Sequence, residues 1–169
     1  MNETTSRSDD LIYAIESIPS WAELLNDARQ QLSPQLRMTV GQILSTLLIA
    51  TDDGANVIAM GGEIDNNGHG YLAIVTSNGV VYVDARKITT TESDHTVTLY
   101  PLSDVRNLSV ATRSVFFEES ASRRPRESRL SVEFEIAAHN VRLTVPDYAE
   151  VPFRTGDALV DAYKILWNR

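Results

Sequence analysis

The hydrophobic positions of the chain repeat with a helical period in its first third and with a strand period after it. Between Leu11 and Leu47, apolar residues recur every three or four positions, which predicts a series of amphipathic helices. From Asn56 onward the period changes to two, which is typical of β-strands. A last helical pattern follows Thr155. The sequence therefore predicts an α+β protein with helices on either side of a β-rich segment.

Capping and turn residues divide the helical third. The first helix is expected to be capped by Asp9 or Asp10 and ended by Pro19. Ser20–Glu23 has the pattern of a capping box, in which the serine and glutamate side chains each bond the other residue's free backbone N–H. The helix that this box opens is predicted to run to about Leu32.

Ser33-Pro34 supplies an N-cap and a first helical residue for a third helix. Asp52-Asp53-Gly54 is expected to end that helix. A first strand is predicted at Val57–Ile64, where Gly61-Gly62 indicates a bulge or a strong bend.

The clearest strand pair is the stretch Tyr71–Arg86, in which two apolar runs flank Asn78-Gly79. This dipeptide predicts a type I′ hairpin turn, because both residues tolerate positive φ. Taking it as the turn sets the register and separates the two faces. The pairs expected are Thr76–Val81, Ile74–Val83, Leu72–Ala85, Val75–Tyr82, Ala73–Asp84 and Tyr71–Arg86. The residues expected to face the core are Leu72, Ile74, Val81 and Val83.

The later strands complete a set of seven. Strands are predicted at 96–102 and 105–114, and a second hairpin is predicted around a turn at His139-Asn140. That turn pairs Ala138–Val141, Ile136–Leu143 and Phe134–Val145 on an apolar face. The opposite, solvated face carries Glu133, Glu135 and Arg142.

Two stretches resemble the sequences of bacterial pleckstrin-homology-like (PH-like) domains. Gly70–Thr76 followed by Gly79–Val83 resembles their second and third strands, and Tyr100–Val105 resembles the proline-containing junction between their fourth and fifth strands. The resemblance covers about residues 56–168. It implies a seven-stranded antiparallel β-barrel with a C-terminal capping helix.

The closing helix fits that expectation, because Leu159, Leu166 and Trp167 would fill one open end of the barrel. Residues 1–52 are then expected to form an N-terminal helical extension, and residues 53–169 the PH-like β-barrel domain. A different small β-barrel or sandwich with helices at either end is the alternative.

Composition narrows the class of protein. The 169 residues include no cysteine, which excludes disulfides and thiolate metal sites. The net charge is −8, and residues 1–65 carry ten acids and three bases, so broad capture of nucleic acid is disfavoured. The polar, acidic N-terminus differs from a signal peptide, and a cytoplasmic location is expected.

Metal ligands and catalytic motifs give no positive case for an enzyme. Asp65–Gly70 superficially resembles a calcium loop but has His69 where an EF-hand needs Asp or Asn, so it is interpreted as a turn. His69, His95 and His139 are all expected in loops or turns, scattered over the surface. No nucleophile elbow or dinucleotide fingerprint is present in the sequence. No metal and no cofactor is expected.

A group of arginines in a polar stretch is the most suggestive candidate binding site. Arginine's planar fork suits phosphate and carboxylate groups. Interleaved glutamates offer a simpler explanation, a solvated loop that balances its own charges. The candidate binding residues are Arg113, Arg123, Arg124, Arg126 and Arg129.

The resemblance to PH-like domains implies an interaction or assembly module, and some of these domains form ring-like oligomers. Phosphoinositide-binding members hold the headgroup with basic residues around the loop between the first two strands. The corresponding loop here, Asp65–Gly70, has no Lys or Arg. The sequence therefore predicts a non-catalytic module for protein–protein binding or self-assembly. The alternative is peripheral binding of anionic lipid through the arginine loop.

Overall fold

The computed structural model describes residues 7–30, 33–88, 93–112, 130–146 and 151–168. Within these ranges the α-helices are α1 (Arg7–Glu16), α2 (Pro19–Arg29), α3 (Pro34–Ala50) and α4 (Gly156–Trp167), and a short 3-10 helix, η1, spans Leu102–Asp104. The strands are β1 (Val57–Ile64), β2 (Gly70–Thr76), β3 (Gly79–Arg86), β4 (Asp94–Pro101), β5 (Arg106–Thr112), β6 (Leu130–Ile136) and β7 (His139–Thr144).

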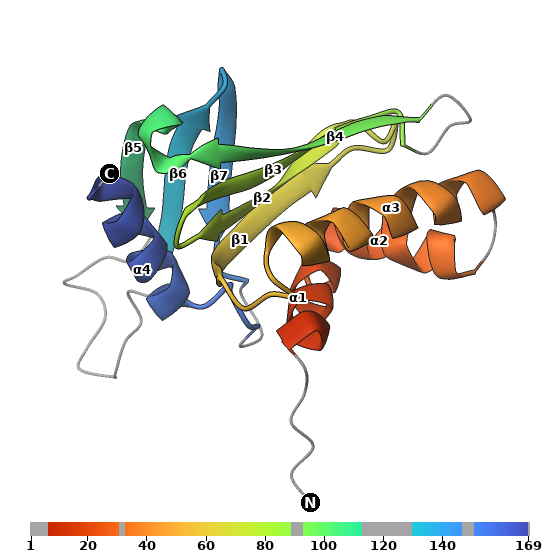
Figure 1. The fold of residues 1–169 in the computed structure, drawn as a ribbon, viewed down its shortest axis with the longest axis horizontal. Helices are drawn as coiled ribbons and strands as arrows, with labels where there is room; N and C mark the ends of the chain where they lie inside the picture. Colours follow the sequence, from red (N-terminus) through yellow and green to blue (C-terminus); the bar gives the residue numbers. More distant parts are fainter. Residues whose placement is uncertain (1–6, 31–32, 89–92, 113–129, 147–150, 169) are drawn as a thin grey trace, which may run out of the picture.

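The strands form two antiparallel sheets, one of order β1-β2-β3-β4 and one of order β5-β6-β7 (Figure 1). Helix α4 packs against β1, β5 and β6, at one side of the pair of sheets. The predicted α+β class and the C-terminal helix are confirmed. The expected barrel is not seen as a closed one, because the seven described strands remain divided into sheets of four and three.

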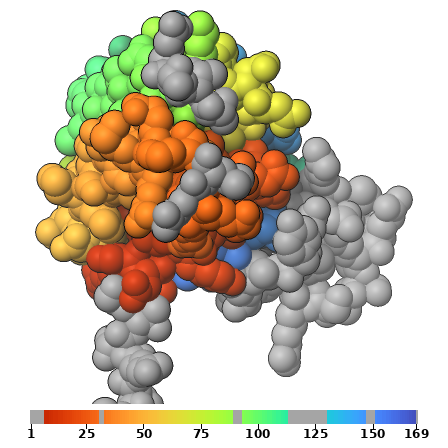
Figure 2. All heavy atoms as spheres, turned by 90° about the vertical axis from the view of Figure 1, so that its right-hand side faces the viewer, coloured from red at the N-terminus to blue at the C-terminus, as the bar shows by residue number. Residues whose placement is uncertain are grey.

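Strands β2 and β3 are buried along almost their whole length, because both faces of their sheet are covered. Alternate residues point to opposite faces. One face packs against α1, α2 and α3, and the other packs against the second sheet and α4. In Figure 2 the red and orange helices lie as one layer against the yellow and green strands. The residues predicted to face the core are fully buried, but the helices cover them: Leu72, Ile74, Val81 and Val83.

The turn of the first hairpin lies one residue earlier than predicted, and this changes the pairing of the two strands. Leu72 lies opposite Val83 and Ile74 opposite Val81, so the turn residues are Ser77 and Asn78. Neither Asn78 nor Gly79 has positive φ. The buried Thr76 hydroxyl accepts bonds from the backbone N–H groups of Asn78 and Gly79, at 3.3 and 3.1 Å. These local bonds select the turn in place of the Asn-Gly preference.

The second hairpin turns earlier than predicted. Phe134 lies opposite Val141 and Ile136 opposite His139, so Ala137 and Ala138 form the turn. Their φ values are 48° and 63°, which fits a type I′ turn without its usual Asn or Gly. The turn lies two residues earlier than predicted. Because this shift is even, each side chain of the hairpin still lies on the predicted face. Glu133 and Arg142 pair on the solvated face at 3.1 Å.

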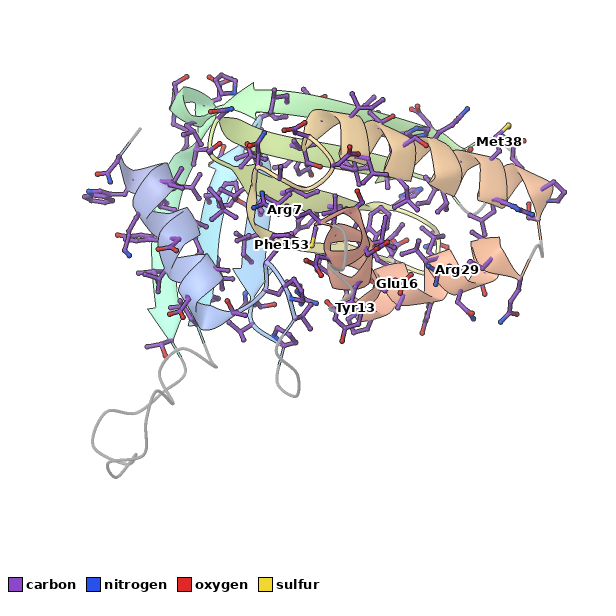
Figure 3. All side chains as sticks on the ribbon, turned by 60° about the horizontal axis from the view of Figure 1, so that its bottom comes forward. Arg7, Tyr13, Glu16, Arg29, Met38 and Phe153 are labelled. Atoms are coloured by element: carbon purple, nitrogen blue, oxygen red, sulfur yellow. The ribbon has the colours of Figure 1, made fainter. Side chains whose placement is uncertain are left out.

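The N-terminal helices begin at different residues than the capping-box pattern predicts. Helix α1 ends at Glu16, and Pro19 begins α2 instead of ending α1. The N-cap of α2 is Ile18, with no side-chain cap. The Ser20 hydroxyl instead accepts a bond from the backbone N–H of Ile64 in β1, at 3.1 Å. Glu16 and Arg29 form an ion pair between α1 and α2 (Figure 3).

Other end signals are confirmed. The Ser33 side chain accepts a bond from Leu36 N at the start of α3, and the Thr155 side chain accepts one from Ala158 N at the start of α4. Helix α3 ends at Ala50 in a turn where Asp52, Asp53 and Gly54 all have positive φ. No helix of the described segments has the length and apolar character needed to cross a membrane.

The expected bulge in β1 is displaced from the two glycines. The pairing of β1 with β2 shifts between Val57 and Ala59, whereas Gly61 and Gly62 pair regularly. A Cβ on Gly61 would lie 2.9 Å from the carbonyl oxygen of Arg142 in β7. The absence of a side chain at Gly61 therefore allows the edges of the two sheets to approach each other.

Candidate functional site

The arginines predicted as the binding site lie outside the described residues. These are Arg113, Arg123, Arg124, Arg126 and Arg129. Among the described residues, two other surfaces are candidates: a groove lined by tyrosines, and the outer edge of β5, with which no other described strand pairs.

The tyrosine groove has a volume of about 500 Å³ and lies where the β6–β7 turn approaches the ends of β1, β2 and β3. Its walls combine aromatic rings with charged side chains of both signs. The lining residues are Glu63, His69, Gly70, Tyr71, Tyr82, Asp84, Ala85, Arg86, Lys87, His139 and Asn140.

A row of stacked rings forms the inner wall of the groove. Tyr71 stacks on Tyr82 with ring centroids 5.8 Å apart, and His139 stacks on Tyr82 at 5.1 Å. Tyr100 meets the edge of Tyr82 at 6.4 Å. These rings come from four strands, so the sheet register and the β6–β7 turn together position the row.

The two groove tyrosines differ in their hydrogen bonds. The Tyr71 hydroxyl accepts a bond from the backbone N–H of Arg142 at 3.0 Å, which ties the row to β7. The Tyr82 side chain is only 4% exposed, and no residue of the described chain forms a hydrogen bond with its hydroxyl. The Tyr82 oxygen is not among the buried unpaired atoms of the described residues, so its hydroxyl reaches solvent in the groove.

Two carboxylates flank the row on the same face of the sheet. Glu63 lies opposite Tyr71, and Tyr71 lies opposite Asp84. The Asp84 Oδ2 atom accepts bonds from Arg86 Nε and Nη2, at 2.9 and 2.6 Å. Within the described residues, Glu63 forms no hydrogen bond or ion pair. The inner groove is therefore rich in hydrogen-bond acceptors.

The ionisation of Tyr82 follows from this setting. Burial raises the pKa of Tyr82 to about 12, and the charge of Asp84 adds to the shift. Burial also raises the pKa of Tyr71. Both shifts favour the neutral phenol, so each hydroxyl remains a hydrogen-bond donor and acceptor at ordinary pH.

We expect the stability of the protein to fall at alkaline pH because of Tyr82. Between about pH 10 and pH 12 the unfolded chain loses the Tyr82 proton while the folded chain keeps it, so the free energy of unfolding decreases by roughly 2 kcal/mol. Urea unfolding at several pH values measures this fall. Tyr82→Phe should reduce the fall, whereas Tyr163→Phe, which keeps both groove tyrosines, should not. An equal fall in both variants would contradict the assignment.

Two of the three histidines were predicted incorrectly. His95 lies within β4 and His139 begins β7, and only His69 lies in a turn. His69 and His139 both line the groove. The predicted turn at Asp65–Gly70 is confirmed, because Asp65 Oδ1 accepts bonds from the backbone N–H groups of Asn67 and His69. The bond from His69 contributes most to lowering the pKa of Asp65.

The second candidate surface is the outer edge of β5, the edge opposite β6. Among the described strands, β5 pairs only with β6, and all of its residues except Leu108 are exposed. Val110 lies opposite the buried Val132, on the core face of the sheet, yet is 47% exposed. Helix α4 packs beside β5 and ends in Trp167, which is 66% exposed and stacks on Tyr163.

Trp167 therefore departs from the expectation that it fills the barrel end. Leu159 and Leu166 are fully buried as predicted, but Trp167 extends beyond the core. A further hollow, of about 700 Å³, follows the outer face of α3 and includes the exposed Met38 (Figure 3). Arg37 is its one titratable lining residue. It offers no chemistry beyond that of a helix surface.

Sequence reasoning missed the tyrosine groove because the groove closes only where the start of β7 meets the end of β1 and the β2–β3 hairpin, an approach that no local pattern shows. The predicted register places Tyr71 opposite Arg86, whereas Tyr71 lies opposite Asp84. The alternation of Tyr82 and Asp84 in β3 was the available signal, since it places an aromatic ring and a carboxylate on one face.

Comparisons with known proteins return no match: no family model fits the chain, and no curated protein or solved structure is significantly similar to it.

Proposed function

We propose that this protein is a non-catalytic PH-like interaction module that binds polypeptide chains by adding a strand to the edge of β5. The observation that carries the proposal is an exposed strand edge with which no other described strand pairs, and on which the apolar residue Val110 is 47% exposed. We expect the added strand to be β5 of a second copy of the chain.

The arrangement of elements supports the PH-like part of the proposal. Four consecutive strands form one sheet, the next three form the other, and the closing helix packs between them against β1, β5 and β6. The stretch that resembles the PH-like junction, Tyr100–Val105, lies where the chain leaves β4 for β5, with Pro101 at the end of β4. Both features agree with the fold that the sequence resemblance implies.

The composition of β5 supports strand addition. Natural proteins protect sheet edges with charged side chains, prolines or bulges. Here the pairing with β6 is irregular only between Arg106 and Ser109, and the stretch 107–112 has no charged residue and no proline. Backbone N–H and C=O groups along such an edge can pair with another strand, as in other β-augmentation interfaces.

The absence of acidic residues from β5 favours a second copy as the occupant. Two chains of net charge −8 repel each other over most of their surfaces, but two β5 edges bring together no acidic residues. Val110 adds apolar surface on the core side of this edge, and the exposed Trp167 lies at the end of α4, the helix that packs beside β5. Self-association is therefore expected to strengthen as salt screens the remaining repulsion.

Sedimentation velocity over a wide range of protein concentration, at low and high salt, tests this proposal. The expected result is a concentration-dependent dimer that Val110→Lys abolishes. Ile49→Lys is the matched control, because Ile49 is also an exposed apolar residue, on α3, and should leave the dimer unchanged.

A photo-crosslinking amino acid at position 110 or at position 49 identifies the occupant in the cell. Crosslinks at position 110 to a second copy support self-assembly, and crosslinks there to another protein support binding of a different chain. A monomer at every concentration, together with no crosslink specific to position 110, would contradict strand addition at β5.

A further inference from the structure

We propose that β5 pairs with β5 of a second copy in antiparallel orientation about a twofold axis at Val110, and that this pairing closes the assembly at two chains. The inference rests on the strand addition proposed above and specifies its register and its symmetry. The two copies then share one continuous sheet of order β7-β6-β5-β5-β6-β7.

A bulge limits the part of β5 that can pair with another strand. Between Arg106 and Ser109, β5 has one residue more than the stretch of β6 that it faces, Glu133–Glu135. Within this bulge Asn107 has a φ of 50°, and its Nδ2 atom donates a bond to Glu135 Oε2 at 2.6 Å. A bulge bends its strand and interrupts the ladder of backbone groups. The regular part of the β5 edge therefore begins after Asn107.

The side chains of this regular part alternate between the two faces of the sheet. Val110 lies on the core face, opposite Val132, whereas Ser109 lies on the solvated face, opposite Glu133. Beyond the bulge, even-numbered residues of β5 therefore share the face of Val110, and odd-numbered residues share the face of Ser109. Val110 is exposed in the single chain, so an added strand must place an apolar side chain beside it to cover it.

Symmetry restricts the registers that two copies of β5 can adopt. A twofold axis perpendicular to the sheet keeps each residue on the same face in both copies, so two residues that lie opposite each other differ by an even number of positions. The axis then passes between the two copies of one residue. With the axis at Val110, position 110 faces 110, position 109 faces 111, and position 108 faces 112.

The axis at Val110 is the register that uses only the regular, uncharged part of the edge. An axis at Ser109 would bring the bulge residue Asn107 opposite Ala111. An axis at Ala111 would bring the charged Arg113 opposite Ser109. With the axis at Val110, the two valine side chains meet on the core face with Cβ atoms about 4.5 to 5.5 Å apart, and each covers the other.

The symmetry also decides how far the assembly grows. Twofold pairing uses the same edge of both copies, so no β5 edge remains for a third chain. Head-to-tail pairing of β5 with a different edge would leave one edge open at each end and would grow into rings or filaments. The twofold dimer also places both α4 helices, which pack on the core face beside β5, on one side of the shared sheet.

Single cysteines in the full chain test the register, because the sequence has no cysteine of its own. The variants Ser109→Cys, Val110→Cys, Ala111→Cys and Thr112→Cys are oxidised in air, with the exposed Ile49→Cys on α3 as the control for random collisions. The highest disulfide yield is expected at position 110, since each step away from the axis separates the two copies of a residue by roughly 7 Å more along the strands. A mixture of Ser109→Cys and Ala111→Cys should give mainly the mixed dimer, because these positions face each other.

The outcomes separate this inference from the proposed function. A dimer that Val110→Lys abolishes in sedimentation, but whose highest disulfide yield lies at another position, would overturn the register and leave strand addition intact. Equal yields at all four positions would indicate parallel pairing, and species larger than a dimer would indicate head-to-tail assembly, so either result would also overturn the inference. A monomer with disulfide yields no higher than that of Ile49→Cys would contradict strand addition itself.

Discussion

Replacement of Trp21 by alanine is expected to lower the free energy of unfolding by about 3 to 5 kcal/mol. Trp21 lies in α2, is 1% exposed and belongs to the core that the helices share with β1–β4. Its Nε1–H donates a hydrogen bond to the backbone carbonyl of Tyr71 in β2, at 3.1 Å. The substitution leaves a large cavity and also removes a buried hydrogen bond between helix and sheet.

Urea unfolding monitored by circular dichroism measures this loss. Tyr13→Ala is the matched control, since it removes an aromatic side chain that is 52% exposed on α1, and its effect should stay below about 1 kcal/mol. Trp21→Phe removes the hydrogen bond but only part of the indole volume, so its expected cost is smaller, about 1 to 3 kcal/mol. Similar losses in Trp21→Ala and Tyr13→Ala would show that α2 is not packed as described.

The role of Trp21 bears on how the chain is divided. The sheet face that the helices cover carries residues that are fully buried, including Leu72, Ile74 and Val81. Removal of residues 1–52 would expose this face to water, at a cost of roughly 25 cal/mol per Å² of apolar surface. Experiments on either candidate surface therefore require the full chain.

Local signals in the sequence predicted the element ends well where one side chain decides them. Ser33 and Thr155 cap their helices as expected, because a hydroxyl before a helical run bonds the first free N–H groups. Ser20 shows where such signals fail. Its hydroxyl is used by Ile64 in β1, a partner 44 residues away that no local pattern can indicate.

The two hairpin registers were not predictable from turn preferences. Asn78-Gly79 is a strong turn signal, yet the Thr76 hydroxyl bonds the backbone at both of these residues and moves the turn back by one. Ala137-Ala138 adopts positive φ without a residue that favours it. There Phe134 and Val141 pack into the core that lies between the two sheets and α4, and this packing sets the register instead.

The candidate sites also differ in whether a local sequence signal reveals them. The arginine loop was visible as composition alone, and its residues lie outside the described ranges. The predicted register already placed Tyr71, Tyr82 and Asp84 on one face, and the observed register keeps them there. The groove was still not predictable, because its other walls come from the end of β1 and the start of β7. The approach of these strands is a tertiary contact that no single-strand pattern shows.

Replacement of Gly61 by alanine is expected to destabilise the protein by about 3 kcal/mol, while the same change at Gly41 stabilises it slightly. A Cβ at Gly61 would meet the Arg142 carbonyl oxygen at 2.9 Å and the Leu143 Cα at 3.1 Å, and neither backbone atom can move without shifting β7. A Cβ at Gly41, in α3, meets no atom within 4 Å, so only the gain in helix propensity remains, about 0.5 to 1 kcal/mol.

The opposite signs of these two changes make the test specific to the contact between the sheets. Both variants add one methyl group to a glycine, so composition and unfolded-state effects are similar. Chemical unfolding compares their stabilities, and the amide signals of Arg142 and Leu143 report whether β7 has moved. If Gly61→Ala is as stable as Gly41→Ala and these signals stay in place, β1 and β7 do not approach as closely as described. If β7 moves, the start of that strand moves with it, and His139 should lose its stacking on Tyr82, so the ring signals of these two residues should shift together with the loss of stability.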